Sequence, residues 1–400
     1  MAGFLFAMKS MDDIEECIRS GVYSTYVPGN WNRTTYSTLG DYFSMKPGDN
    51  IYFFNKRKIY GIGEIRSFGD GVTVINNYRD DSGVATNNSN TSLLRHRPNG
   101  NGRGKVQRWV INFVPAPAFY EIGADMDDLL DSNPPAFRIL RAFSGRSFIK
   151  FDDEENAAFK AGIFQKNLST SARHVNGGEP QTVRCDNEST LERFTRTLAD
   201  QGETFEDRAT NLRHLIALKR GKRGVRAGEI PEMLVEDAII NALVRQDTDA
   251  ERAFGHWDYV SHQVPASPMK PSQYMDYMDV FGYRWIQGLD EKIIDQFLII
   301  EIKKDVSDGL NDGSAVATQI MKYVDWVCQH YAGGDYAQIK AFIVAHDFHP
   351  QQGNRSQIQR KYITTNREQR TSEWEDVTLV TYDTDAEGDI TFRPYQSTAA

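Results

Sequence analysis

Alternating apolar and polar positions in the carboxy-terminal half of the chain predict a strand with two different faces. In the segment FLIIEIKKD, residues 297–305, successive side chains of a strand point to opposite sides of a sheet. Three aliphatic residues that end with Ile302 share one face, which we expect to lie in the core. The other face carries Glu301 and Lys303, which stand about 7 Å apart in an extended chain.

A second predicted strand, YMDVFGYRW at residues 277–285, comes earlier in the chain and is followed by the turn-like sequence GLDEK, 288–292. A hairpin that is symmetric about residue 290 places Asp279 directly opposite Glu301. Like charges that face each other across two strands destabilise a sheet, so this pair requires a compensating cation. Two carboxylates beside a lysine suit Mg²⁺, which takes oxygen ligands from one or two carboxylates, water and a substrate phosphate.

Two predicted helices carry polar residues where an apolar face is expected. In PEMLVEDAIINAL, residues 231–243, Glu236 lies on the apolar stripe of the helix. It either supports a metal site or lies at a solvated edge of the helix. In the helix 315–330, Gln319 and Tyr323 are four residues apart on one face, where they belong either to a site or to ordinary helix surface.

The remaining pattern predicts two domains, α+β and α/β. Residues 1–168 hold short β-type runs separated by Gly, Asn, Asp and Pro, which favours a compact curved sheet. The polar stretch 169–187 is typical of a linker, and 188–400 begins with a helical stretch that extends to Lys219. The part that follows predicts a mixed sheet flanked by helices. Its expected elements are helices at 231–245 and 315–330 and strands at 277–285, 296–303, 339–346 and 377–382.

Composition and charge limit the classes of function. The chain has 400 residues, 40% of them hydrophobic, which is enough to bury more than one core. A formal charge of −9 excludes a polyelectrolyte coat for nucleic acid but does not describe local charge. Two basic runs lie at 95–108 and 219–226, and the second is as typical of a solvated helix end as of a binding site.

Cysteine spacing and hydropathy argue against several other classes. Cys17, Cys185 and Cys328 lie far apart and form no C-x-x-C pair, which disfavours a disulfide framework and a structural zinc site. No apolar run approaches the roughly 20 residues that span a bilayer, and the first residues lack the pattern of a signal peptide. We therefore expect a soluble, cytoplasmic protein.

The order of these polar positions resembles the PD-(D/E)XK nuclease superfamily over about residues 230–385. The shared order is an acid-bearing helix, a strand with Asp279, a strand with Glu301-x-Lys303, and a helix with Gln319-x-x-x-Tyr323. The closest branch includes restriction endonucleases and the archaeal and actinobacterial mismatch nucleases. One departure is that Met278, and no proline, precedes the aspartate.

The resemblance implies a role for each matching residue. Asp279, Glu301 and the Ile302 carbonyl would hold Mg²⁺, for which Mn²⁺ is expected to substitute. Lys303 would orient or deprotonate the attacking water, while Glu236 would support the metal or a second ion. Gln319 completes the expected catalytic set. The reaction implied is metal-assisted hydrolysis of a phosphodiester bond.

The amino-terminal half resembles the PUA-like superfamily, in particular its EVE and YTH branches. The resemblance rests on GVYSTYVPGNWN at 21–32 and KPGDNIYFFNKRKIYGIGEI at 46–65, with looser matches further along. It implies a curved sheet with an aromatic pocket for an extruded modified base. The implied pocket walls are Tyr23, Trp31 and Phe53, and the implied polar readers are Ser24 and Asn55. The two basic runs would then contact the DNA backbone, through Arg97, Arg103, Lys105, Lys219, Arg220, Lys222 and Arg223. With 18 Tyr and 22 Phe in the chain, most aromatic residues must belong to the core instead.

Together the two resemblances imply a modification-dependent restriction endonuclease of type IV or type IIM-like character, a phage-defence enzyme that cuts double-stranded DNA near a modified base. Because cutting both strands needs two active sites, we expect a homodimer. Two other classes stay open at this point: a repair nuclease for mismatched or branched DNA, and a nucleic-acid binding protein with an inert nuclease fold. The intact Asp279, Glu301 and Lys303 argue against the inert protein.

Overall fold

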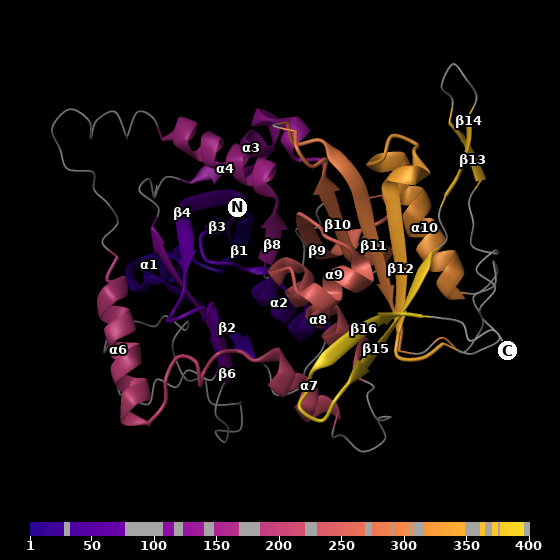
Figure 1. Cartoon of the computed structure of the whole chain (residues 1–400). Coiled ribbons are helices and arrows are strands. Elements are labelled where there is room, and N and C mark those ends of the chain that lie inside the picture. The colour runs from indigo at the N-terminus through magenta and orange to yellow at the C-terminus, as the bar shows by residue number, and fades with distance from the viewer. Residues whose placement is uncertain are drawn as a thin grey trace. The chain divides into compact units, whose positions relative to one another are not determined.

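The computed structural model describes residues 1–27, 33–76, 107–115, 123–139, 148–167, 185–220, 230–268, 274–289, 291–304, 306, 315–348, 361–364, 370–374 and 377–395. The chain divides into two compact units, Met1–Ile139 with Gly145–Thr210, and Leu140–Ser144 with Asn211–Ala400. The structure is α+β, with a curled sheet in the first unit and a separate mixed sheet with helices in the second (Figure 1). Within the described residues, no helix is both long and apolar enough to cross a membrane.

The first unit is built around a sheet whose main path has the strand order β2-β6-β4-β3-β1-β8, with β5 paired to β6 and β7 paired to β4. Strands β1 and β3 are parallel, and the other pairs are antiparallel. Its elements are β1 (Gly3–Ala7), α1 (Met11–Ser20), β2 (Val22–Val27), α2 (Arg33–Ser44), β3 (Asn50–Asn55), β4 (Lys58–Arg66), β5 (Val74–Asn76), β6 (Gln107–Pro115), β7 (Ala124–Asp125), α3 (Met126–Ser132), η1 (Pro134–Ala136), β8 (Phe148–Phe151), α4 (Asp153–Lys166) and α6 (Asn187–Asp200).

The helical stretch that the sequence predicts up to Lys219 is broken into two helices. Helix α6 ends at Asp200, and the next helix begins only at Leu212. Between them Gly202 has φ 70°, a left-handed backbone that glycine adopts readily and that ends a helix. Helix α6 lies in the first unit, where the Asn187 side-chain amide donates to Gly21 O at 3.1 Å.

The second unit has a six-stranded mixed sheet with the order β16-β15-β12-β11-β10-β9. Strand β12 is parallel to β11 and β15, and the other pairs are antiparallel. The sequence pattern predicts neither β9, β16 and the short helix α9 nor the hairpin at 361–373. The elements are α7 (Leu212–Arg220), α8 (Glu232–Arg245), α9 (Thr248–Phe254), β9 (Tyr259–Pro265), β10 (Tyr277–Trp285), β11 (Ile294–Ile302), α10 (Ala315–His330), η3 (Tyr336–Gln338), β12 (Ile339–Ala345), β15 (Thr378–Thr384), β16 (Ile390–Pro394) and a separate hairpin of β13 (Lys361–Thr364) and β14 (Arg370–Glu373).

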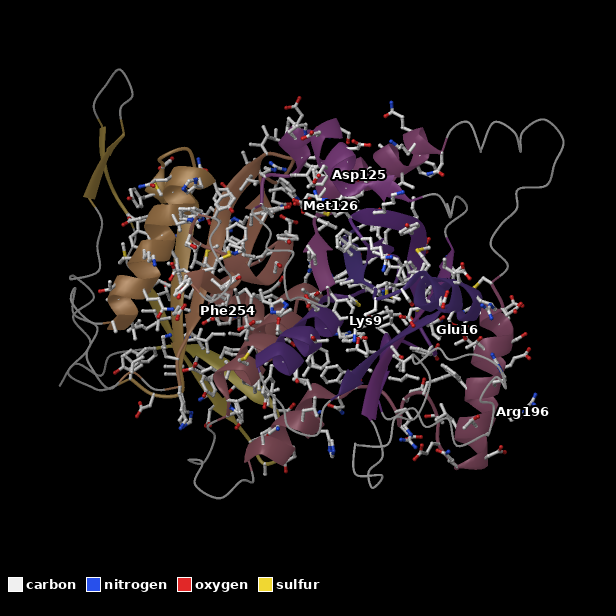
Figure 2. The ribbon with its side chains drawn as sticks, turned by 180° about the vertical axis from the view of Figure 1, so that it is seen from behind. Lys9, Glu16, Asp125, Met126, Arg196 and Phe254 are labelled. Atoms are coloured by element: carbon white, nitrogen blue, oxygen red, sulfur yellow. The ribbon has the colours of Figure 1, made fainter. Side chains whose placement is uncertain are left out.

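Apolar side chains from both helices and strands fill the core of this unit. Helix α8 packs on β9, β10 and β11, and helix α10 packs on β11 and β12. Phe254 at the end of α9, labelled in Figure 2, has its ring centroid 5.4 Å from those of Phe342 and Phe392. One helix and two strands that are distant in sequence therefore meet around one aromatic cluster.

Both faces of β11 are buried, although the sequence predicts only one core face. Ile300 and Ile299 point to opposite sides of the sheet, and each has no exposed surface. Phe297, on the face of Ile299, has its ring 6.1 Å from that of Tyr331, which directly follows α10. Glu301 shares this face and is only 1% exposed, so its carboxyl group lies inside the protein.

Candidate functional site

The strand register that the sequence predicts from the turn is confirmed. Val280 pairs with Ile300, and the same register continues to Arg284 and Gln296, with a shift only beyond that point, toward the turn. One step further in this register places Asp279 opposite Glu301. The ladder itself ends at Val280, because the Asp279 carboxylate takes up the next donor. Its Oδ2 accepts the Ile302 backbone N–H at 2.9 Å.

Burial raises the pKa of both carboxyl groups, and neighbouring acids add to the rise. Burial raises the pKa of Glu301 to about 7, although the Lys303 ammonium opposes the rise. Burial also raises the pKa of Asp279 well above its ordinary value, and the charges of Glu301 and Glu236 raise it further. Such a pair of acids is stable in its ionised form only when additional positive charge lies beside it.

Lys303 supplies part of that charge. Its Nζ lies 2.5 Å from Glu301 Oε1, and its side chain is 25% exposed. Burial lowers the pKa of Lys303, but the charges of Glu301 and Asp279 outweigh it and leave the pKa raised. The ammonium form is therefore favoured, and the lysine reaches from the buried acid toward solvent.

The second oxygen of Glu301, Oε2, is buried and has no hydrogen-bond partner. A buried carboxylate oxygen without a partner is costly, which makes it a candidate ligand for a cation. The carboxylates of Asp279 and Glu301 and the Ile302 carbonyl form an all-oxygen donor set, the kind that Mg²⁺ and Mn²⁺ prefer. Across the described residues, no group of three or more His, Cys, Asp or Glu side chains is placed to hold a metal ion. The donor set thus fits a metal that keeps several water or phosphate ligands.

Glu236 is buried, so the interpretation of a solvated helix edge is wrong. It is 2% exposed, and its two oxygens are held by neighbouring side chains of β9. Oε1 lies 2.9 Å from His262 Nδ1, and Oε2 accepts the Gln263 side-chain amide at 2.9 Å. The same amide nitrogen lies 3.4 Å from Asp279 Oδ1, which connects Glu236 to the site.

His262 and Gln263 are site residues that the sequence pattern does not predict. Their segment, YVSHQVP, has every residue buried, so it shows no clean alternation of apolar and polar positions. The one available signal was the run of three polar residues, Ser261, His262 and Gln263, between apolar residues.

Helix α10 brings its predicted polar pair together. Gln319 Nε2 donates to Tyr323 Oη at 2.9 Å, and Tyr323 is 3% exposed, so ordinary helix surface does not describe it. Burial raises the pKa of the Tyr323 hydroxyl, and the charges of Glu301 and Asp279 raise it further. Tyr323 therefore lies within electrostatic reach of both acids.

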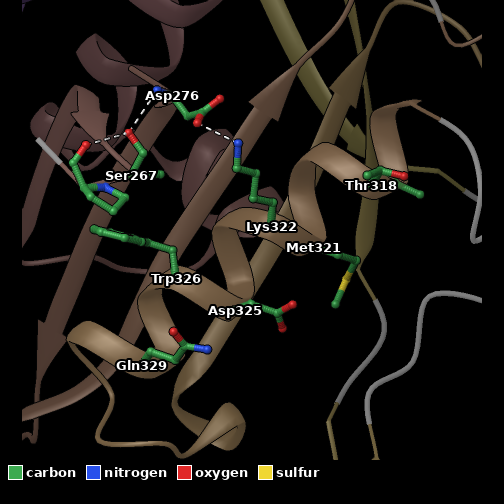
Figure 3. A pocket seen from close by; sticks show the side chains of 11 residues that line it. Ser267, Asp276, Thr318, Met321, Lys322, Asp325, Trp326 and Gln329 are labelled. Carbon is green, nitrogen blue, oxygen red and sulfur yellow. Dashed lines mark hydrogen bonds and ion pairs between the residues drawn. The ribbon is translucent and has the colours of Figure 1, made fainter. Parts of the chain in front are cut away.

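A separate pocket of about 650 Å³ lies along α10 (Figure 3). Lys322 forms an ion pair with Asp276 there, with Nζ and Oδ2 2.6 Å apart. The Trp326 side chain lines the same pocket, and its Nε1 is buried without an acceptor. None of the predicted site residues lines it.

The residues implied for a base pocket lie mainly inside the first unit. Phe53 has no exposed surface and Tyr23 is 7% exposed. Their rings lie 6.1 and 4.6 Å from that of Phe6, so both belong to the aromatic core. Ser24 is 3% exposed, and Asn55 is 5% exposed and donates to Met8 O at 2.9 Å. Trp31 lies outside the described residues.

Most of the candidate phosphate contacts lie outside the described residues. These are Arg97, Arg103, Lys105, Lys222 and Arg223. Lys219 and Arg220, the first two residues of the second basic run, are the last two residues of α7. Their contact with a nucleic acid stays a prediction.

Comparison with known proteins leaves the family open. No family model matches the sequence, and no curated protein matches it. Among solved structures, the YTH domain of the Zygosaccharomyces rouxii MRB1 protein in complex with N6-methyladenosine RNA has 11% identity and a TM-score of 0.22, covering 40% of this chain and 83% of that chain. A repair endonuclease from Pyrococcus abyssi has 17% identity and a TM-score of 0.15, covering 28% of this chain and 38% of that chain. A hypothetical protein from Leishmania major has 13% identity and a TM-score of 0.23, covering 43% of this chain and 97% of that chain. Scores this low identify neither fold nor activity.

Proposed function

We propose that this chain is a metal-dependent endodeoxyribonuclease. The observation that supports it most is the convergence of Asp279, Glu301 and Lys303 at one end of the β10–β11 hairpin, where two buried acids repel each other and one carboxylate oxygen has no partner. A purely structural ion pair would need neither the second acid nor the unpartnered oxygen.

Asp279, Glu301 and the Ile302 carbonyl would hold Mg²⁺ or Mn²⁺ in this proposal. When bound, the ion polarises a phosphoryl oxygen and lowers the pKa of coordinated water. Lys303 keeps its proton, since its pKa is raised, and it orients the attacking water while balancing charge that develops on the phosphate. Gln319 donates to the Tyr323 hydroxyl, which lies within electrostatic reach of the acids and would supply a hydrogen-bond donor there.

The proposed substrate is double-stranded DNA that carries a modified base, and the first unit is the proposed reader. The support is the sequence resemblance and the curled sheet of that unit. Because Phe53 and Tyr23 are core residues, Trp31 becomes the principal candidate for a ring that stacks on an extruded base. Replacing Trp31 by Ala should erase the preference for modified DNA and leave cleavage itself intact. An unchanged preference would place the reader elsewhere.

A digest panel tests the activity. The protein is incubated with Mg²⁺ and with unmodified, methylated, hydroxymethylated, glucosylated, mismatched and branched DNA. We expect cleavage of one or more modified DNAs only. Equal cleavage of unmodified DNA would remove the sensing role, and cleavage confined to mismatched or branched DNA would favour a repair nuclease.

Two variants test the roles within the site. Asp279→Asn and Lys303→Met should each lower the cleavage rate by about 100-fold or more, because each removes charge that acts on the transition state. Lys292→Met is the matched control, since Lys292 closes the neighbouring acid-x-Lys triplet at the exposed turn. DNA binding in Ca²⁺ should stay unchanged in all three. Normal cleavage by either site variant would show that the assignment is wrong.

A further inference from the structure

A buried glutamine lies between two acids that come from different elements. Gln263 belongs to the edge strand β9 and is 4% exposed. Its amide nitrogen Nε2 donates to Glu236 Oε2 at 2.9 Å and lies 3.4 Å from Asp279 Oδ1. One amide group thus links the carboxylate of α8 to the carboxylate of β10.

The backbone at Gln263 departs from the strand to make this placement possible. Its φ is 51°, in the left-handed region that residues with a Cβ seldom adopt. The β9–β10 register pairs Met278 with Val264 and Val280 with His262, so Gln263 stands opposite Asp279. The ladder skips this pair alone and continues in the same register on both sides. The departure is therefore confined to the residue that contacts both acids.

The other oxygens of these two carboxylates are already held. Asp279 Oδ2 accepts the Ile302 N–H at 2.9 Å, and Glu236 Oε1 lies 2.9 Å from His262 Nδ1. The Gln263 amide donates to the remaining oxygen of each acid, Glu236 Oε2 and Asp279 Oδ1. It fixes how both carboxylates are rotated without adding negative charge among groups that repel one another.

We propose that Gln263 is a positioning residue of the metal centre, which orients Asp279 and Glu236 for a bound divalent cation. The inference rests on the proposed function. Hydrogen-bond partners of this kind hold ligands in one orientation, and their loss typically lowers metal affinity by about 10–100-fold. A left-handed glutamine in the middle of a buried strand is a costly arrangement, and such local strain is typical of functional sites.

Mn²⁺ binding to the full chain without DNA, measured by isothermal titration calorimetry, tests this role. Gln263→Gly removes the amide and relieves the backbone strain, so the Kd for Mn²⁺ should rise about tenfold or more while the thermal midpoint changes little. Gln263→Asn keeps an amide on a residue that tolerates this backbone, and it should recover part of the affinity. Gln246→Gly is the matched control, because Gln246 is also left-handed, with φ 57°, at the exposed end of α8.

The outcomes distinguish a failure of the positioning role of Gln263 from a failure of the proposed nuclease function. A wild-type Kd in Gln263→Gly, or tighter binding, would overturn the positioning role and leave the proposed nuclease standing. If Gln263→Gly unfolds, the Kd of Gln263→Asn for Mn²⁺ is compared with that of the wild type instead, and an unchanged Kd would again overturn the positioning role. A wild-type chain that binds no Mn²⁺ would overturn both this inference and the proposed function.

Discussion

At the scale of single residues, the site is governed by the cost of burying negative charge. Glu301 is 1% exposed, and within the described residues its carboxyl group accepts a hydrogen bond from one cation, the Lys303 ammonium. The charge of Glu301 lies close enough to raise the pKa of the buried Asp279 carboxyl group. The arrangement is poor for stability and suited to binding a cation, because a bound ion turns an unfavourable cluster into a favourable one.

The pKa of Glu301 leads to a prediction about stability and pH. Its value rises from 4.5 to about 7 on folding, so the folded protein binds this proton more tightly than the unfolded chain does. The associated stability is present below pH 4.5 and is lost as the pH rises through 7. A shift of this size corresponds to about 3 kcal/mol at most. Urea unfolding of the metal-free protein at pH 5 and pH 8 should show the loss.

Glu301→Gln should remove most of this pH dependence, because the amide carries no charge at either pH. Glu387→Gln, at an exposed turn, is the control and should keep the wild-type dependence. Added Mg²⁺ should stabilise the wild-type protein more at pH 8 than at pH 5. A wild-type stability that rises between pH 5 and pH 8 while Glu301→Gln behaves identically would contradict a raised pKa at Glu301.

At the scale of elements, the close approach of β9 to β10 positions the site. Gly282 allows it, since a Cβ at this position would lie 2.5 Å from the Tyr259 carbonyl oxygen. Gly282→Ala should therefore push β9 away from β10, with a cost of about 1–3 kcal/mol in the free energy of unfolding. Because β9 carries Gln263, Mn²⁺ affinity should fall as well.

Gly288→Ala is the control for Gly282→Ala, because it strains the backbone of the hairpin without moving β9. Gly288 has φ 82° at the open turn of the same hairpin, so alanine there should cost about 1 kcal/mol through its backbone alone. Mn²⁺ affinity should stay at the wild-type value. Equal affinity in Gly282→Ala and wild type would show that the spacing of β9 and β10 does not matter to the site.

The sequence predicts the β10–β11 hairpin well for a physical reason. The turn fixes the register of a hairpin, and the alternation of side chains then decides which residues face each other. Glu301 and Asp279 follow from these two rules. Strand β9 could not be predicted in the same way, because all seven of its residues are buried and pack against partners that are distant in sequence. The role of Gln263 depends on that packing and on an unusual φ, which no local pattern indicates.

The sequence does not distinguish aromatic residues of a binding pocket from those of the core. From the sequence alone, Tyr23 and Phe53 fit either a pocket or a core, and only their burial in the structure separates the two. Their rings meet Phe6, which comes from a third strand. A sequence rich in aromatic residues gives no means of selecting which rings remain accessible.

At the scale of the whole molecule, cutting both strands of a duplex requires two sites, so we expect the chain to act as a homodimer. Mixing a threefold excess of Asp279→Asn with wild-type protein before adding modified plasmid DNA should form mixed dimers. Gel analysis should then show nicked circles in place of linear DNA. Linear product in simple proportion to the wild-type protein would indicate that each chain cuts independently.

The central claim is that Asp279, Glu301 and the Ile302 carbonyl bind one divalent cation. Anomalous diffraction from crystals of the protein soaked in Mn²⁺ tests it most directly. The account predicts a peak about 2.0–2.2 Å from one oxygen of each of these three groups. A peak elsewhere, or an unchanged Lys303–Glu301 pair without a peak between the two acids, would contradict it.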